Sequence, residues 1–145
     1  MNHTYLQKTL NKQKWYLIDA KNQRLGRLST CIAKLLKGKN EITYTPHINS
    51  KIHIIVINAQ NVMVTGQKKY NKKYVRHSGK PGSLKIENFA NLNKRIPTRI
   101  IEHAIKGMLP KNKLGRQLFR QINIYKSEQH PHTAQKPETI TINLL

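Results

Sequence analysis

The sequence predicts a single α/β domain with a mostly parallel sheet and helices on both faces of that sheet. Its 145 residues are about the length of one domain, and a chain of this length buries roughly two thirds of its unfolded surface on folding. No internal repeat and no linker-like change of composition divides it. Segments with strand patterns alternate with segments of helical periodicity, which is typical of βαβ units.

The N-terminal half predicts strands around one helix. Residues 15–20 (WYLIDA) form a short aromatic and aliphatic run that indicates a strand. Residues 51–59 (KIHIIVINA) hold consecutive apolar positions and predict a strand covered on both faces, and residues 61–65 (NVMVT) predict a further short strand. Between the first two strands, apolar residues recur at helical spacing up to Gly38, which is placed to end a helix. These residues are Leu28, Cys31, Ile32, Leu35 and Leu36.

The middle of the chain has no clear period. Residues 67–83 contain turn formers and many cations, and they predict a basic loop or ribbon. Residues 86–92 suggest a short helix. Pro97 is suited to a first helical position, and the apolar stripe that follows it predicts a helix up to Gly107.

The C-terminal part predicts a helix over residues 113–119, a strand over residues 122–125 (INIY), and an extended tail from residue 126. Residues 1–13 are expected to be an N-terminal extension. The whole chain, residues 1–145, is therefore interpreted as one domain with an extension at each end.

Charge is the most unusual property of the composition. Twenty-seven Lys and Arg residues face six acids, which gives a formal net charge of +21 and a pI of about 10.4. Eight cations and no acid lie between Glu41 and Glu87, and six cations lie between Glu102 and Glu128. Because these segments are the ones expected to be loops and irregular turns, the pattern favours binding to a nucleic acid over a solvated helix face. No helix combines a broad apolar face with a dense basic one, so a membrane partner is not expected.

Two tyrosines lie among cations in residues 68–76 (KKYNKKYVR). Cations that pair with phosphates and rings on which bases stack would suit structured RNA with unpaired bases. The alternative is that Tyr70 and Tyr74 pack over the sheet edge while the lysines solvate them, and the sequence leaves both interpretations open.

Enzyme and metal signatures are absent from the sequence. It has no phosphate-loop, dinucleotide-binding or zinc-protease motif, and no spacing supports a triad of Asp19, Ser29 and His47. His130 and His132 have no further ligands close by, so a phosphate-facing or solvent-exposed pair is expected there rather than a metal site. The sequence therefore predicts no catalytic residue, no cofactor, no metal and no small-molecule substrate.

The single cysteine, Cys31, excludes an internal disulfide and lies on the apolar face of a predicted helix, where a small buried side chain is expected. The first residues carry no secretory or transit pattern, so we expect the protein to act where it is made. Lys, Asn and Ile supply 51 of the residues, and their A/T-rich codons indicate an A/T-rich genome such as that of an organelle.

Seven blocks closely resemble the bacterial-type large-subunit ribosomal protein thirteen family. They are WYLIDA, LGRLST, YTPH, VINA, VTG, RHSGKPG and IKGMLPKNKLGRQLF, and they occur in family order between about residue 15 and residue 135. Asn22 replaces a glycine common in the family, the loop reads SGKPGS where members often have a bulkier residue and paired glycines, and residues 139–145 extend slightly past a typical end. These departures affect loop and tail details only.

The resemblance implies a three-layer α/β/α domain with a four-stranded, mainly parallel sheet. It also implies a structural constituent of the large ribosomal subunit that binds ribosomal RNA, contacts neighbouring ribosomal proteins and supports early assembly. The expected location is a ribosome in the plastid (chloroplast) stroma, or alternatively in bacterial cytoplasm. The alternative function is a free-standing RNA-binding translational regulator that uses the same surface.

The family's RNA-facing blocks and the distribution of cations together define the expected contact residues. In residues 106–120, a helix broken at Gly107 and Pro110 would aim its cations at RNA while leucines anchor it, and Gly115 would allow a close backbone approach. The expected RNA-binding residues are Arg24, Arg27, His47, Lys68, Lys69, Tyr70, Lys72, Lys73, Tyr74, Arg76, His77, Lys80, Lys106, Lys111, Lys113, Arg116 and Arg120.

Overall fold

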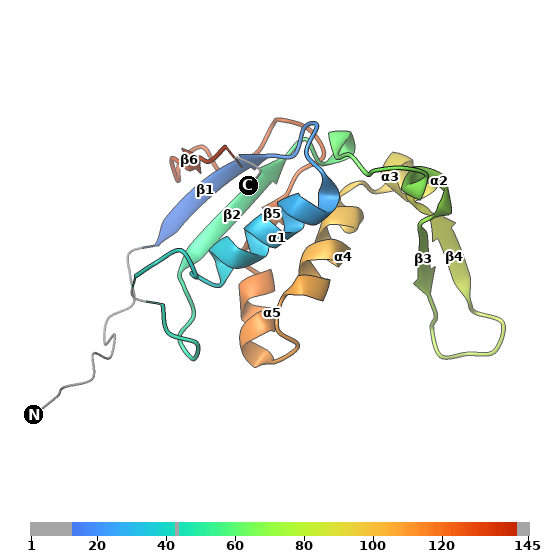
Figure 1. Cartoon of the computed structure of the whole chain (residues 1–145), viewed down its shortest axis with the longest axis horizontal. Coiled ribbons are helices and arrows are strands. Elements are labelled where there is room, and N and C mark those ends of the chain that lie inside the picture. The colour runs from blue at the N-terminus through green and yellow to red at the C-terminus, as the bar shows by residue number, and fades with distance from the viewer. Residues whose placement is uncertain (1–12, 43, 142–145) are drawn as a thin grey trace, which may run out of the picture.

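A computed structural model describes residues 13–42 and 44–141 of the chain (Figure 1). The elements of the sheet and of its helices are β1 (Lys14–Asp19), α1 (Leu25–Leu36), β2 (Ile52–Ile57), α4 (Thr98–Met108), α5 (Lys113–Phe119), β5 (Ile122–Ile124) and β6 (Glu138–Thr139). Between β2 and α4 lie the 3₁₀ turn η1 (Ala59–Asn61), α2 (Lys68–Asn71), β3 (Lys73–Arg76), β4 (Lys85–Asn88) and α3 (Phe89–Arg95).

The sheet has four strands in the order β5-β2-β1-β6, and each neighbouring pair is parallel. The α/β class and the four-stranded parallel sheet are thereby confirmed. The chain steps from β1 to β2 and then to β5 in the same direction across the sheet. Since crossovers between parallel strands are right-handed, both connections place their helices on the same face. In Figure 1, α1 and α4 accordingly lie side by side on one side of the sheet.

The main core fills the space between this face and the helices. Ile18, Ile54 and Val56 point from β1 and β2 into a cluster that includes Ile101 and Ile105 of α4, and all of them are fully buried. From α1 the cluster takes the apolar stripe expected from the sequence, and Gly38 has a φ of 70° just beyond the helix. Cys31 is half-buried against this core, as expected, and burial raises the pKa of its thiol although Lys34 opposes the shift.

The other face of the sheet is covered by the irregular segment before β6, so the prediction of helices on both faces requires correction. Ile55 is fully buried there, outside the main core cluster. The Trp15 ring stacks on His53 with centroids 4.4 Å apart, and His132 lies 5.5 Å from the same ring. His132 also hydrogen-bonds the Tyr125 hydroxyl at 2.8 Å. A coil can cover this face because aromatic rings supply the apolar area that a helix would otherwise bring.

His130 and His132 are therefore not the solvent-exposed or phosphate-facing pair expected from the sequence. Both are half-buried, and the backbone N–H of His132 donates to Nδ1 of His130 at 3.2 Å. Their position follows from the path of the tail across the sheet, which their spacing in the sequence does not reveal.

The middle of the chain differs most from the sequence-based prediction. Residues 61–65 form no strand, and Met63 only bridges Arg24. Residues 67–83 contain the single-turn helix α2 and the strand β3, which pairs antiparallel with β4 to form a hairpin of residues 73–88. The helix expected over residues 86–92 begins at Phe89, because the residues before it pair with β3. Figure 1 shows this hairpin projecting away from the sheet.

The junction of α4 and α5 agrees with the sequence in all but one detail. Helix α4 continues through Gly107 to Met108, so that glycine does not end it, and Pro110 follows the helix end. Gly115 does permit a close approach, because a Cβ atom there would lie 1.8 Å from the carbonyl oxygen of Pro110. Leu109 and Leu118 are buried and anchor the junction to the core, as expected.

Candidate nucleic-acid interface

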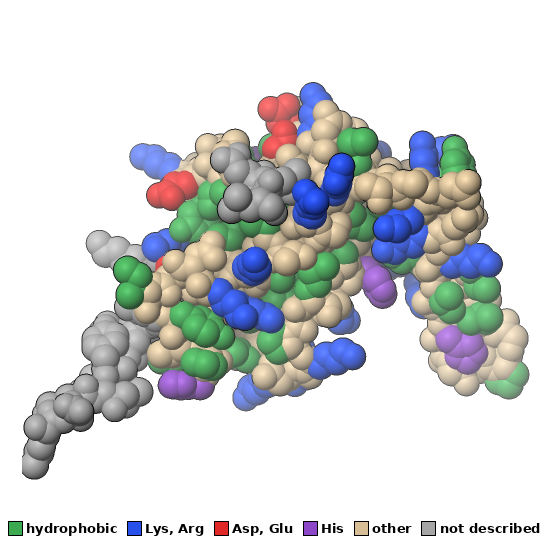
Figure 2. All heavy atoms as spheres, in the orientation of Figure 1, with side chains coloured by type: hydrophobic (Ala, Val, Ile, Leu, Met, Phe, Trp, Pro, Cys, Tyr) green, Lys and Arg blue, Asp and Glu red, His purple; other side chains and the backbone are tan. Residues whose placement is uncertain are grey.

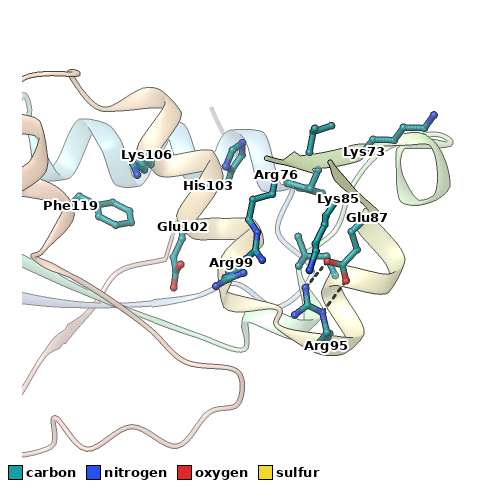
Figure 3. A pocket seen from close by; sticks show the side chains of 13 residues that line it. Lys73, Arg76, Lys85, Glu87, Arg95, Arg99, Glu102, His103, Lys106 and Phe119 are labelled. Carbon is teal, nitrogen blue, oxygen red and sulfur yellow. Dashed lines mark hydrogen bonds and ion pairs between the residues drawn. The ribbon is translucent and has the colours of Figure 1, made fainter. Parts of the chain in front are cut away.

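A groove of about 710 Å³ separates the β3–β4 hairpin from α4 (Figure 3). Six cationic side chains line it against two acids. The cations are Lys73, Arg76, Lys85, Arg95, Arg99 and Lys106, and the acids are Glu87 and Glu102. Because the hairpin, α3 and α4 all contribute cations, positive charge faces the groove from more than one wall, which suits a bound polyanion.

One of the two acids is already neutralised inside the groove. Glu87 accepts two hydrogen bonds from Arg95, from Nε to Oε1 at 3.1 Å and from Nη2 to Oε2 at 2.6 Å. This contact, together with Coulomb attraction from Arg95, Arg99 and Arg76, lowers the pKa of the Glu87 carboxyl below its ordinary value. Glu87 therefore stays ionised and fixes Arg95 (Figure 3). Within the part of the chain that the structure describes, Arg76, Lys85 and Arg99 form no ion pair with an acid.

Aromatic rings lie among these cations. The ring of Tyr74 meets His103 edge to face, with centroids 5.7 Å apart. Lys72 lies over Tyr74 at 5.6 Å from its centroid, and burial raises the pKa of the Tyr74 hydroxyl. Tyr74 is half-buried and packs against the core, so the packing alternative considered for it applies to most of its ring. His103 is exposed, and the half-buried Phe119 also lines the groove.

The short helix α2 places further cations outside the groove. Lys68, Lys69 and Lys72 are exposed there, whereas Lys73 begins the hairpin and points away from the groove in Figure 3. Tyr70 is 67% exposed and its ring lies 6.0 Å from the ammonium of Lys69. The two tyrosines of this segment are thus in different surroundings, since Tyr70 is open to solvent and Tyr74 is not.

A second basic region joins the start of α1 to the α4–α5 junction. Arg24 precedes α1 and Arg27 is exposed on its first turn. Thr30, one turn further along, donates a hydrogen bond from Oγ1 to Sδ of Met108 at 3.5 Å, which brings the exposed side of α1 to the end of α4. We call this region the junction surface; its cations are Arg24, Arg27, Lys111, Lys113, Arg116 and Arg120, all of them exposed.

The junction surface owes its shape to local interactions. The side chain of Asn112 caps α5 by accepting a hydrogen bond from the backbone N–H of Gly115 at 2.8 Å. Lys113, Arg116 and Arg120 follow at spacings of three and four residues, which places them on one side of the helix.

Besides the α2 residues Lys68, Lys69, Tyr70 and Lys72, three predicted residues lie apart from both surfaces. His47 is exposed in the turn between α1 and β2, where Ile48 hydrogen-bonds Thr45. His77 and Lys80 lie in the exposed loop at the end of the hairpin, and His77 Nδ1 accepts a hydrogen bond from Gly79 N–H at 2.9 Å.

Four groove residues were missed by the sequence reasoning. Arg99 and His103 lie one turn apart on α4, on the side opposite its apolar stripe, and Lys106 follows at the next turn. That spacing was readable from the sequence and marks a polar helix face. Lys85 and Arg95 gave no comparable signal, because the pairing of β3 with β4 brings Lys85 to the groove and the position of α3 after the hairpin brings Arg95.

Positive charge dominates the face of the molecule shown in Figure 2, where Lys and Arg side chains spread over the helices and the hairpin. Within residues 13–42 and 44–141, the ion pairs are Lys14 with Glu41 at 2.8 Å and Arg95 with Glu87 at 2.6 Å. The described residues contain no helix long and apolar enough to cross a membrane. They also contain no cluster of three or more His, Cys, Asp or Glu side chains arranged to hold a metal ion.

Comparisons with known proteins agree with the resemblance seen in the sequence. Residues 13–131 match the family described as Ribosomal protein L13. "Large ribosomal subunit protein uL13" of Gloeothece citriformis is 58% identical over 137 residues, which cover 94% of this chain and 90% of the relative. "Large ribosomal subunit protein uL13c" of Gracilaria tenuistipitata var. liui is 57% identical over 141 residues, covering 97% and 99%. The fold, the basic surfaces and these similarities lead to one conclusion: the chain belongs to the ribosomal protein L13 family.

Proposed function

We propose that this protein is a structural constituent of the large ribosomal subunit and binds large-subunit ribosomal RNA through the groove, the exposed lysines of α2 beside it, and the junction surface. Membership of a family of structural ribosomal proteins supports the first part, and it agrees with the prediction that the chain is not an enzyme. The observation that carries the second part is the groove, whose lining includes six Lys or Arg residues and two acids, and one of these acids is paired with Arg95.

Binding rests on charge neutralisation and shape. Each Lys or Arg that contacts a phosphate releases condensed counterions, which favours association at low salt. The hairpin holds Arg76 and Lys85 opposite Arg99 on α4, so the two walls contact the same stretch of backbone from different sides. The break between α4 and α5 leaves Lys111 and Arg116 exposed on the junction surface, where a continuous helix would have spread such cations around a cylinder.

Two separate basic surfaces on one small protein would hold two RNA segments together. The groove lies between the hairpin and α4, and the junction surface lies at the far end of α4 and on α1. A protein that ties segments from different parts of the RNA stabilises folded intermediates, so we propose a role early in subunit assembly. Neighbouring ribosomal proteins are the expected protein partners.

The proposed location is a ribosome in the plastid stroma. The abundance of Lys, Asn and Ile indicates an A/T-rich genome, a relative named uL13c comes from Gracilaria tenuistipitata var. liui, and other similar relatives come from cyanobacteria. The alternative location is the cytoplasm of a bacterium, and the identity of the genome that encodes the chain decides between them.

Salt titration of RNA binding tests the mechanism. Binding to a large-subunit RNA fragment should weaken as salt rises, with a log–log slope of about −0.7 to −0.9 for each phosphate neutralised. Replacing Lys68, Lys69, Lys72 and Lys73 with Gln should reduce the affinity and the slope while leaving the thermal transition nearly unchanged, because all four side chains are exposed. Affinity that hardly depends on salt would contradict charge neutralisation.

Sedimentation separates the ribosomal constituent from a free-standing translational regulator. A constituent should migrate with large subunits through a gradient at physiological salt. A regulator with the same surface would be found mainly outside the ribosomal fractions.

A further inference from the structure

We propose that the groove receives an unpaired RNA nucleotide, whose base lies against the ring of His103 while its phosphates pair with the cations around it. The proposal rests on the function given above and specifies the RNA structure that the groove takes. It concerns the groove rather than the junction surface, because the groove brings three rings together with its cations.

The groove combines the two groups that a nucleotide needs. His103, Tyr74 and Phe119 supply rings, and stacking on such rings is the usual way in which proteins bind unpaired bases. Arg76 and Arg99 supply charge close to those rings, since Arg76 is in the strand that carries Tyr74 and Arg99 lies one turn before His103. A paired base stays inside its helix and cannot reach a ring in a groove, so the ligand is a base outside the helix.

The dimensions agree with a small ligand. Pockets of about 300 to 1,000 Å³ typically accommodate small molecules, and the groove measures about 710 Å³. An intact RNA duplex is far wider than such a space and would contact only its rim. The groove therefore fits a nucleotide and its neighbouring phosphates better than a helix.

Polar atoms are available to contact the edge of the base. The hydroxyl oxygen of Tyr74 is buried and makes no hydrogen bond within the described chain, although Tyr74 lines the groove. His103 is exposed and meets the Tyr74 ring edge to face, so a base that lies against His103 is close to the ring that carries this hydroxyl. An unsatisfied buried hydroxyl costs free energy unless a ligand supplies a partner, and the edge of a base is such a partner.

The test compares two short RNA duplexes that differ only by one unpaired nucleotide, with the fluorescent base 2-aminopurine at that position. The wild-type protein should bind the bulged duplex about tenfold more tightly than the uninterrupted one, which is within the range expected for stacking one base on one ring. The fluorescence of 2-aminopurine should fall on binding, because stacking quenches it.

Replacing His103 with Ala should remove both the preference and the quenching while leaving affinity for the uninterrupted duplex unchanged. The matched control is His47→Ala, which removes an exposed histidine outside the groove and should keep the preference. The Lys85→Gln variant should weaken binding of the bulged duplex but keep the quenching, since it removes a charge from the groove and leaves the ring of His103 in place. Both histidines are exposed, so the folds of these variants should remain intact, as circular dichroism can verify.

The outcomes distinguish this inference from the function on which it rests. Equal affinity of the wild-type protein for the two duplexes, or a preference that survives His103→Ala, would overturn the nucleotide site and leave RNA binding standing. Failure to bind any RNA, including a large-subunit fragment, would overturn the proposed function itself.

Discussion

The sheet with its helices α1, α4 and α5, called the sheet domain below, and the β3–β4 hairpin differ in how they place apolar side chains. In the sheet domain, Ile101 is fully buried among the helices and strands. In the hairpin, Val75 and Ile86 are opposite each other on paired strands, yet they are 61% and 55% exposed. A two-stranded ribbon buries too little apolar surface to be stable by itself, so the hairpin depends on its attachment to α3 and α4. The sheet domain provides stability, and the hairpin provides a wall of the basic groove.

Identical substitutions in the two regions should show the largest difference in stability. Replacing Ile101 with Ala leaves a cavity in the core and should lower the free energy of unfolding by about 3 kcal/mol. Replacing Ile86 with Ala removes an exposed side chain and should change it by less than about 0.5 kcal/mol. Urea denaturation measures both, and equal losses would mean that the hairpin is part of the folding core.

Two glycines of the α4–α5 junction should respond in opposite directions. A Cβ at position 115 would collide with the carbonyl of Pro110, so Gly115→Ala should destabilise the protein by about 2 kcal/mol. The control is Gly107→Ala. A Cβ at position 107 would meet nothing within 4 Å, and the position is inside α4, so this change should stabilise the protein by roughly 0.5 to 1 kcal/mol. Thermal unfolding of the two variants compares them, and a neutral Gly115→Ala would refute the close packing of the turn.

The ion pair in the groove should make a small contribution that depends on pH. Hydrogen bonding from Arg95 lowers the folded-state pKa of Glu87 below its ordinary 4.5. The contribution of the ion pair to the free energy of unfolding is therefore fully present above that pH. The contribution is lost as the pH falls through the lowered pKa. The wild type should therefore be slightly more stable than Glu87→Gln at neutral pH, with a difference that disappears on acidification. Melting curves of both proteins from neutral to acidic pH test this, and a difference that grows at low pH would have the wrong sign.

The sheet domain could be predicted closely from the sequence. The runs at residues 15–20 and 51–59 and the helical stripe around Ile32 correspond to β1, β2 and α1, because buried elements impose a strict pattern of apolar residues. Asn22, in the turn between β1 and α1, takes the left-handed conformation with a φ of 59°. Asparagine is among the residues that tolerate this conformation best.

The hairpin could not be predicted in the same way. Residues 73–76 (KYVR) and 85–88 (KIEN) carry exposed apolar side chains beside charges, so burial imposes no period on them. They become strands through pairing with each other, which is a tertiary effect. The sequence therefore identifies residues 68–80 as a basic segment. It does not reveal the groove, because the groove depends on the position of the hairpin against α4, with Arg95 and Arg99 on its other side.

The most direct test of the division between a stable sheet domain and an RNA-binding groove measures stability and RNA affinity in the same variants. The groove variant replaces Arg76, Lys85 and Arg99 with Gln, and the control replaces three exposed lysines outside both basic surfaces. The control positions are Lys21, Lys51 and Lys126.

The groove variant should unfold within about 0.5 kcal/mol of the wild type, because its changed side chains are exposed. Its log–log salt slope for binding a large-subunit RNA fragment should be smaller in magnitude by about 2 to 3, and the slope of the control should change less. A control variant that loses as much affinity as the groove variant would contradict the account, because RNA affinity would then depend on the total charge of the protein and not on the groove.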